Sequence, residues 1–403
     1  MIAKIFPSSA HGTVNAPPSK SMAHRLLICA AMSDGVSTVR GISNCDDVSA
    51  TVDCLTSLGA IIKADGDIYT VTGADMHTAA PGRVLMCHES GSTLRFIIPL
   101  AMISGNTVRL RGASSLMSRP MSVYEELFSE REASFCKNGD TVTVSGPLSA
   151  GEYIVRGDVS SQFITGLLFA LPLLDGDSVI KILPPFESKS YIDLTLIALH
   201  KFGIDVSFSD ELTICIKGNQ RYKPCSVTVE GDYSGSAFTD ALGIFSNGVQ
   251  VLGLDENSFQ GDRVYKDFYK ELQAGTPTLN IENCPDLGPV LFALAAALNG
   301  AEFLGTARLK IKESDRAAVM AEELKKLGAK IEIFENSVTV KKSSLHAPSK
   351  PIYGHNDHRV VMSMAVLLSL FGGEIHGADA VKKSYPAFFD DIKKLGIKVE
   401  LYD

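Results

Sequence analysis

The sequence predicts an α/β protein built from two similar halves. Six short polar stretches are each followed by an apolar run of helical length, and most of these starts lie about 70 residues apart. Between them an amphipathic helix followed by two strands recurs. Spacing this regular indicates one supersecondary unit that is used several times. The polar, proline-containing stretch 217–230 separates the third copy from the fourth, so we expect two groups of three units.

The six apolar runs each follow residues that favour a helix start, namely Ser, Asp, Asn, Gly or Pro. They are PSKSMAHRLLICAAM from Pro18, SGSTLRFIIPLAM from Ser90, SSQFITGLLFALPLL from Ser160, DYSGSAFTDALGIF from Asp232, PDLGPVLFALAAAL from Pro285 and NDHRVVMSMAVLLSLF from Asn356. Because these runs are apolar on all faces, we expect buried helices. The uninterrupted apolar stretches are shorter than the roughly 20 residues that a membrane-spanning helix needs, and we expect no membrane partner.

The second recurring element is clearest at 51–73, 192–218 and 320–342, each an amphipathic helix followed by a hairpin. Copies at 123–146 and 264–282 are weaker, and the C-terminus carries a truncated one. Glycines stand where the helix C-caps are expected: Gly59, Gly203, Gly328 and Gly396. The turns ADGD, KNGD and FENS suit hairpins.

Composition excludes several classes of protein. The net charge is −8, so a broad basic face for nucleic acid is not expected. The eight cysteines show no paired or zinc-ligand spacing, which indicates reduced thiols in a cytoplasm and no metal site. The N-terminal residues lack a signal-peptide pattern, which agrees with a cytoplasmic location.

Cations at the starts of the apolar runs predict an anion site. The first amides of a helix lack internal partners and carry a partial positive charge, which favours phosphate or carboxylate. Lys20, Arg25, Arg95 and Arg359 stand at such starts, and Arg119, Arg316 and Lys383 stand in other polar stretches. For any single residue a structural role remains open, such as helix capping by Ser19 or a helix-flank position for Arg25. The whole set favours a site, because desolvation discourages cations beside buried helices.

Nine motifs resemble those of the 5-enolpyruvylshikimate-3-phosphate synthase family over the whole chain. They are PSKSMAHR (18–25), ESGSTLRF (89–96), SRPM (118–121), SSQF (160–163), ESKSYIDLT (187–195), PDLGPV (285–290), KIKESDR (310–316), NDHRVVM (356–362) and KSYPAFF (383–389). They occur in the family's order and at its spacing. The resemblance implies two similar domains, each an inverse α/β barrel of three βαβαββ repeats. It implies one domain of residues 14–229, a second of residues 1–13 plus 230–403, and an active site in the cleft between them.

The resemblance also implies the reaction. An enzyme of this family, a 3-phosphoshikimate 1-carboxyvinyltransferase, moves the enolpyruvyl group of phosphoenolpyruvate to the 5-hydroxyl of shikimate 3-phosphate and releases phosphate. The product leads to chorismate and the aromatic amino acids. The family needs no cofactor or metal, and we expect a cytoplasmic monomer whose partners are these two small molecules. The family is the target of the herbicide glyphosate, which mimics phosphoenolpyruvate.

The motifs carry the expected site residues. The phosphoenolpyruvate-binding set is Lys20, Gly91, Arg119, Gln162, Arg316, Arg359 and Lys383. The set for shikimate 3-phosphate is Ser21, Arg25, Ser160, Ser161, Gln162, Ser188, Tyr191, Asp286 and Lys312. We expect Asp286 to act as base toward the hydroxyl, Glu313 to donate a proton to carbon, and Lys20 to act as a possible shuttle. The resemblance leaves the choice between acid and base open.

Some positions depart from the family pattern. The first motif lacks the usual Gly before SKS, the second reads ESGST in place of Asn-Ala-Gly-Thr, and Arg308 replaces a common Asn. Gly91 is retained, and because it has no side chain we expect glyphosate sensitivity, with Ser92 and Phe96 leaving its degree open.

Two alternative functions share part of this pattern. The first is UDP-N-acetylglucosamine 1-carboxyvinyltransferase, which shares the fold and the donor but carries Lys-Asn at the first helix and a reactive Cys on a loop. Here Ser21 follows Lys20, and the LRGASSLMSRP segment has no Cys. The second is a two-domain anion-binding protein without catalysis, which only a turnover experiment distinguishes from the enzyme.

Overall fold

The structure is a computed structural model that describes residues 1–78, 80–129, 131, 133–246 and 248–403. The chain forms two compact units: a central unit of Lys20–Glu230, and a terminal unit of Met1–Ser19 with Gly231–Asp403. The weak copy expected at 123–146 includes positions 130 and 132, which lie outside the described residues.

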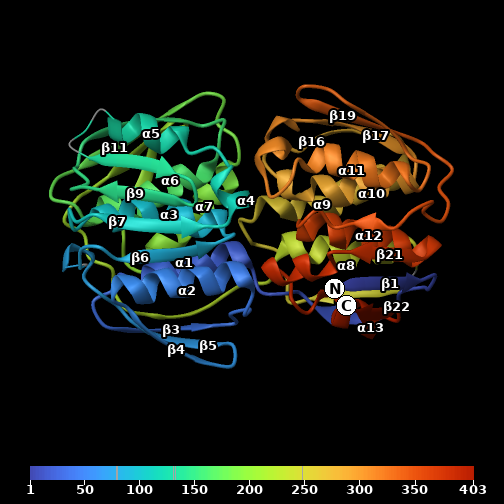
Figure 1. Cartoon of the computed structure of the whole chain (residues 1–403), viewed down its shortest axis with the longest axis horizontal. Coiled ribbons are helices and arrows are strands. Elements are labelled where there is room, and N and C mark those ends of the chain that lie inside the picture. Colours follow the sequence, from blue (N-terminus) through green and yellow to red (C-terminus); the bar gives the residue numbers. More distant parts are fainter. Residues whose placement is uncertain (79, 130, 132, 247) are drawn as a thin grey trace. The chain divides into compact units, whose positions relative to one another are not determined.

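The central unit contains three four-stranded sheets and three buried helices among its described residues (Figure 1). Its helices are α1 (Lys20–Ala31), α2 (Asp46–Leu58), η1 (Met76–Thr78), α3 (Gly91–Met102), α4 (Ser114–Met117), α5 (Ser122–Ser129), α6 (Ser161–Ala170), η2 (Leu171–Leu173) and α7 (Lys189–Lys201). Its strands are β3 (Val36–Arg40), β4 (Ile61–Asp65), β5 (Ile68–Thr72), β6 (Val84–His88), β7 (Val108–Gly112), β8 (Ser134–Asn138), β9 (Thr141–Ser145), β10 (Glu152–Arg156), β11 (Ser178–Leu183), β12 (Val206–Asp210), β13 (Thr213–Ile216) and β14 (Ser226–Thr228).

Among its described residues, the terminal unit has two four-stranded sheets, one two-stranded sheet and three buried helices. Its helices are α8 (Tyr233–Ile244), η3 (Gly261–Val264), α9 (Tyr265–Ala274), η4 (Pro285–Leu287), α10 (Gly288–Ala297), η5 (Ala307–Ile311), α11 (Arg316–Lys325), α12 (His358–Phe371), η6 (Ala378–Lys383) and α13 (Phe388–Lys394). Its strands are β1 (Ile2–Phe6), β2 (Gly12–Asn15), β15 (Val249–Leu252), β16 (Thr278–Asn280), β17 (Gly300–Leu304), β18 (Lys330–Ile333), β19 (Ser337–Lys341), β20 (Ile352–Tyr353), β21 (Gly373–His376) and β22 (Lys398–Tyr402).

The sheets show the repeat directly. In the order β10-β11-β13-β12, β10 pairs parallel with β11 across α6, and the hairpin β12–β13 returns antiparallel after α7. The orders β6-β7-β9-β8 and β16-β17-β19-β18 repeat this arrangement. Each is a βαβαββ unit in which a helix connects the two parallel strands and a later helix precedes the hairpin. This confirms the predicted fold class.

The N-terminal strand completes a sheet at the other end of the sequence. In the order β20-β21-β1-β22, β1 takes the place that the fourth strand holds in the other repeats, and it pairs antiparallel with β21 and β22. The labels N and C therefore stand beside neighbouring strands in Figure 1. The predicted crossover near residue 14 falls inside β2, which pairs with β15, so the terminal unit extends to Ser19. The active site expected in the cleft between the two domains stays a prediction.

The buried helices consist mostly of apolar residues, and α10 is apolar on every face. Of the ten residues in α10, nine are buried, from Gly288 through Ala296. In the central unit α3 packs against α6 (Figure 1). Gly166 permits this contact, because a Cβ there would lie 2.4 Å from the Arg95 carbonyl oxygen. All six predicted starts lead into helices, α1, α3, α6, α8, α10 and α12, and the four predicted C-cap glycines have positive φ.

Among the described residues, the structure contains no helix that is both long enough and apolar enough to span a membrane.

Candidate active site

In the central unit, the starts of α3 and α6 come together through side chains of the predicted set. The Arg95 guanidinium donates to Gln162 Oε1 at 2.7 Å and to the Pro120 carbonyl at 3.2 Å. The Gln162 amide in turn donates to Ser92 Oγ at 2.9 Å. The N-terminal ends of two buried helices and the SRPM segment therefore meet in one place, where free helix amides favour an anion.

Gly91 is the first residue of α3, and it lies close to a predicted cation. A Cβ added to Gly91 would be 2.8 Å from Arg119 Nη1 and 3.5 Å from Arg95 Nη1. The absence of a side chain is thus what allows the Arg119 guanidinium to approach the start of the helix. The structure brings together Gly91, Arg119 and Gln162, three members of the predicted phosphoenolpyruvate set.

Lys20 begins α1 and pairs with a carboxylate that the sequence did not single out. Its Nζ lies 2.7 Å from Asp47 Oδ2, in the first turn of α2. The Thr93 hydroxyl of α3 donates to the Asp47 carbonyl at 3.3 Å. Lys20 therefore lies beside the start of α3 rather than in bulk solvent.

Arg25 connects α1 with α7. Its Nε donates to Thr195 Oγ1 at 2.9 Å, and its Nη atoms donate to the carbonyls of Ser21 and Tyr191 at 2.6 and 2.9 Å. Burial lowers the pKa of this guanidinium to about 10. It has only neutral partners in these bonds, so the positive charge favours an anion nearby.

The serines of the predicted shikimate 3-phosphate set lie at helix starts. Ser160 is the N-cap of α6, where its Oγ accepts from the Gln162 amide nitrogen at 3.3 Å, and Ser161 is buried in the first turn. Ser188 is the N-cap of α7, buried, with a φ of 58°. A non-glycine residue in this region of φ is uncommon and marks a constrained backbone.

In the terminal unit, the starts of three buried helices meet at Asp286. Arg359 of α12 donates from Nη1 to Ser234 Oγ of α8 at 2.7 Å and from Nη2 to Asp286 Oδ2 at 2.8 Å. Asp286 lies in η4, directly before α10. Its Oδ1 accepts from Arg316 Nη1 at 2.7 Å and lies 3.4 Å from Lys312 Nζ. Three predicted cations thus surround one predicted carboxylate.

The electrostatics of Asp286 follow from this arrangement. Burial by itself raises the pKa of the Asp286 carboxyl, but the charges of Arg359, Lys312 and Arg316 hold it well below its ordinary value. Asp286 is therefore ionised and is a hydrogen-bond acceptor.

The Arg316 guanidinium contacts three carboxylates. It is 1% exposed, and besides Asp286 it contacts Glu313 Oε2 and Asp357, whose Oδ2 accepts from Nε at 2.9 Å. A phosphate or carboxylate that binds here competes with carboxylates already on the guanidinium. Lys383, 9% exposed, donates from Nζ to the Asn356 carbonyl at 2.7 Å.

Two further ionisable groups in the terminal unit titrate near neutral pH. Burial lowers the pKa of the Lys312 ammonium to about 8, although the Asp286 charge opposes this shift. Burial, followed by the charge of Asp286, raises the pKa of Asp262 to about 6. Asp262 also hydrogen-bonds Ser234, which accepts from Arg359. Groups poised in this range are typical of functional sites.

Sequence reasoning missed four residues that contact the predicted set: Asp47, Ser234, Asp262 and Asp357. Ser234 and Asp357 lie in helix starts that the repeat had already marked, so the pattern itself was a usable signal. Asp47 and Asp262 lie outside the motifs considered, and only packing brings them to the site. The predicted residues fall into two groups, one in each unit, and a single site made from both groups stays a prediction.

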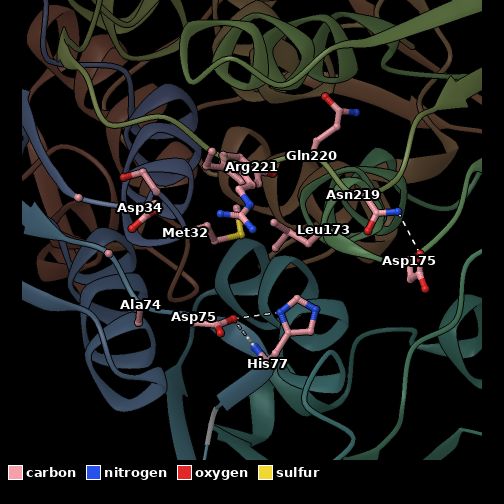
Figure 2. Close-up of a pocket in the computed structure, with 14 residues that line it drawn as sticks. Met32, Asp34, Ala74, Asp75, His77, Leu173, Asp175, Asn219, Gln220 and Arg221 are labelled. Carbon is pink, nitrogen blue, oxygen red and sulfur yellow. Dashed lines mark hydrogen bonds and ion pairs between the residues drawn. The ribbon is translucent and has the colours of Figure 1, made fainter.

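The central unit also has a pocket of about 570 Å³ that is separate from the predicted site residues (Figure 2). It is lined by Met32 and Ser33, which follow the C-terminus of α1, and by Leu173 of η2, and no predicted site residue lines it. Figure 2 shows Arg221 pointing between Met32 and Leu173, with His77 hydrogen-bonded to Asp75 at 2.9 Å. Its lining has three carboxylates, Asp34, Asp75 and Asp175, against one guanidinium, Arg221, so this balance of charge does not favour an anionic substrate.

Solved structures share this fold over the full chain. EPSP synthase from Acinetobacter baumannii aligns with a TM-score of 0.80 and 22% identity, covering 100% of both chains. The enolpyruvyl transferase NikO from Streptomyces tendae aligns with a TM-score of 0.79 and 13% identity, covering 99% of this chain and 98% of that one. The chain therefore has the fold of the enolpyruvyl transferases.

Sequence comparison narrows the class to one family. The family model of EPSP synthase (3-phosphoshikimate 1-carboxyvinyltransferase) matches residues 6–392. A 3-phosphoshikimate 1-carboxyvinyltransferase of Clostridium kluyveri is 39% identical over 98% of this chain and 97% of its own length. One from Clostridium perfringens strain SM101 is 40% identical over 97% of each. The chain belongs to the EPSP synthase family, and it is an enzyme, a transferase.

Proposed function

We propose that the protein transfers the enolpyruvyl group of phosphoenolpyruvate to the 5-hydroxyl of shikimate 3-phosphate, in the pathway to chorismate and the aromatic amino acids. The observation that carries this proposal is that predicted cations lie at the starts of buried helices in both units, within a chain of this family. The two substrates together bring two phosphates and two carboxylates, and such groups require charge-assisted hydrogen bonds.

The two groups of residues are proposed to form one site when the units come together. Lys20, Gly91, Arg119 and Gln162 in the central unit, with Arg316, Arg359 and Lys383 in the terminal unit, would bind phosphoenolpyruvate. Ser21, Arg25, Ser160, Ser161, Gln162, Ser188 and Tyr191, with Asp286 and Lys312, would bind shikimate 3-phosphate. Arginine suits bidentate capture of phosphate and carboxylate, while the serines donate to phosphate oxygens.

The chemistry needs two balanced proton transfers. A proton reaches C3 of phosphoenolpyruvate, the 5-oxygen forms a bond to C2, and the hydroxyl proton leaves. The tetrahedral intermediate then loses phosphate from C2 and a proton from C3, which restores the enol ether. Glu313 is proposed as the donor to carbon and Asp286 as the base. Both contact Arg316. The charge of Arg316 helps to hold the pKa of Asp286 low, so a substrate anion that draws the guanidinium away raises that pKa toward the range that proton transfer requires.

The protein is further proposed to act as a cytoplasmic monomer without a resident metal or cofactor. The reaction exchanges protons and a C–O bond, and it involves no net oxidation or reduction. The charged side chains above supply the stabilisation that the anionic intermediate needs. Size-exclusion chromatography with light scattering tests the monomer.

The direct test is phosphate release from phosphoenolpyruvate with each acceptor in turn. We expect turnover with shikimate 3-phosphate and none with UDP-N-acetylglucosamine, since the first helix carries Lys-Ser rather than Lys-Asn. Turnover with the nucleotide sugar alone would favour the rival transferase. Binding of both substrates without phosphate release would favour a non-catalytic anion-binding protein.

The substitution Glu313→Gln separates catalysis from binding. The amide keeps the size of the side chain but cannot donate a carboxylic proton, so we expect kcat to fall by about 10²–10⁴ while the Kd for shikimate 3-phosphate stays within about threefold. Calorimetry of the variant and a phosphate-release assay measure the two quantities. Unchanged kcat would remove Glu313 from the proton-transfer role.

A further inference from the structure

A fully buried carboxylate lies in the terminal unit behind the predicted site. Glu323 of α11 is 0% exposed, and an ionised carboxylate there requires partners. Its Oε2 lies 2.6 Å from Lys326 Nζ and accepts from the Tyr353 amide at 3.0 Å, while its Oε1 lies 2.7 Å from His355 Nε2. Two of these three partners lie in one short segment before α12: Tyr353 ends β20, and His355 lies in the turn that follows.

That turn has an unfavourable backbone. His355 and Asn356 are consecutive non-glycine residues with φ of 49° and 54°. Each such residue costs roughly 1–2 kcal/mol relative to ordinary backbone, so the surroundings must hold the turn in place. Gly354 before it packs tightly: a Cβ there would lie 2.6 Å from Val361 Cγ2. The Glu323 contacts to Tyr353 and His355 fix the segment on the opposite side.

The turn holds two cations of the predicted phosphoenolpyruvate set. The Asn356 carbonyl accepts from Lys383 Nζ at 2.7 Å. The next residue, Asp357, is the N-cap of α12, accepting from the Arg359 amide at 2.9 Å, and it also accepts from Arg316 Nε at 2.9 Å. A change in the turn therefore moves the acceptors of Lys383 and Arg316 together.

We propose that Glu323 and His355 are positioning residues for the phosphoenolpyruvate-binding cations. They hold the left-handed turn so that the Asn356 carbonyl orients Lys383 and the Asp357 carboxylate orients Arg316. This inference rests on the proposed function, because it assigns a purpose to the placement of those cations. Neither Glu323 nor His355 needs to touch substrate.

A metal-site interpretation of the same residues is less favoured. Glu322, Glu323 and His355 offer ligand atoms within 4.8 Å of one another. Both oxygens of Glu323, however, are already engaged by Lys326, His355 and the Tyr353 amide. The Lys326 ammonium balances the buried charge that a cation would otherwise balance.

The test is steady-state kinetics of His355→Ala and Glu323→Gln in the full chain. We expect the KM for phosphoenolpyruvate to rise about tenfold, the equivalent of about 1.4 kcal/mol, with the KM for shikimate 3-phosphate changed less than about twofold. His355→Gln, whose amide nitrogen can reach Glu323 as Nε2 does, restores most of the loss. Glu322→Gln is the matched control: this neighbouring glutamate is exposed, and its variant behaves like the wild type.

Several outcomes overturn the inference. It is wrong if His355→Ala leaves both KM values and kcat unchanged, even where Glu323→Gln fails to fold. It is also wrong if both KM values rise equally, since that indicates general loss of structure. Stabilisation of the EDTA-treated protein by zinc chloride, abolished in Glu323→Gln, would favour the metal site instead. Absence of turnover in the wild type would overturn the proposed function itself, and the inference with it.

Discussion

At the scale of single residues, the site depends on cations that are partly matched by carboxylates of the chain itself. Arg316 contacts Asp286, Glu313 and Asp357, and Lys20 contacts Asp47. Such pairing limits the cost of desolvating each charge and keeps the side chains oriented. We therefore expect substrate binding to be an exchange of partners, in which phosphate and carboxylate oxygens replace carboxylates of the protein.

Lys312 gives this site a pH dependence. Its ammonium has a pKa of about 8, and only the protonated form attracts a phosphate. As the pH rises from 7 to 9 the protonated fraction falls, so we expect the Kd for shikimate 3-phosphate to rise by up to about tenfold. Calorimetry across this pH range measures the Kd. Lys312→Arg should flatten the profile, because arginine stays charged, while Lys310→Arg at an exposed position should leave it unchanged.

Gly91 leaves space for the Arg119 guanidinium at the start of α3. In Gly91→Ala the new methyl lies 2.8 Å from Arg119 Nη1, so the guanidinium must shift. We expect the KM for phosphoenolpyruvate to rise about tenfold and glyphosate inhibition to weaken at least as much, with the KM for shikimate 3-phosphate little changed. Steady-state kinetics with and without glyphosate measure both changes. Gly275→Ala, where nothing lies within 4 Å of the new Cβ, is the control.

At the scale of elements, the buried helices have two functions. Their bodies fill the interior of each unit, as α10 shows, and their N-terminal ends present free amides and cations at the predicted site. The first function explains the apolar runs, and the second explains why polar and charged residues precede them. A core substitution should therefore affect stability without altering the chemistry.

Phe292 of α10 tests this separation. It is 1% exposed and lies against Phe303 of β17, with the ring centroids 4.8 Å apart. We expect Phe292→Ala to lower the free energy of unfolding by about 3–5 kcal/mol, and the folded fraction to keep its Kd for shikimate 3-phosphate. Urea denaturation gives the first quantity. Phe334, 54% exposed, provides the control, since Phe334→Ala should cost less than about 0.5 kcal/mol.

At the scale of the whole molecule, predicted site residues lie in both units, and we propose that catalysis requires the two units to act together. The active site between them is a proposal with a physical reason: substrate anions neutralise cations whose mutual repulsion opposes closure. Closure would also exclude water from the intermediate.

Small-angle scattering examines this proposal. Addition of shikimate 3-phosphate should reduce the radius of gyration measurably, because the ligand bridges cations from both units. Shikimate without the phosphate should have little effect, since it lacks the charge of the phosphate group. An unchanged radius with saturating shikimate 3-phosphate would contradict ligand-driven closure.

The sequence by itself determined the repeat, and with it the fold class. Apolar runs of helical length, glycine C-caps and hairpin turns are local signals, because helix burial and turn geometry are written in neighbouring residues. All six predicted buried helices are present. The hairpin expected at 264–282 is absent: α9 is followed there by the single strand β16, which pairs with β17. The motifs likewise identified cations at helix starts, since the helix N-terminus itself favours anions.

Only the tertiary structure decided which partners those cations have. Asp47 and Asp262 contact the predicted set because elements distant in sequence pack together. The contact of Glu323 with His355 depends on such packing as well. The place of β1 beside β22 also depends on long-range pairing. Distances between charges depend on how helices pack, which a local pattern does not contain. That is why the sequence predicted the types of residue at the site, and the structure was needed to show the network that holds them.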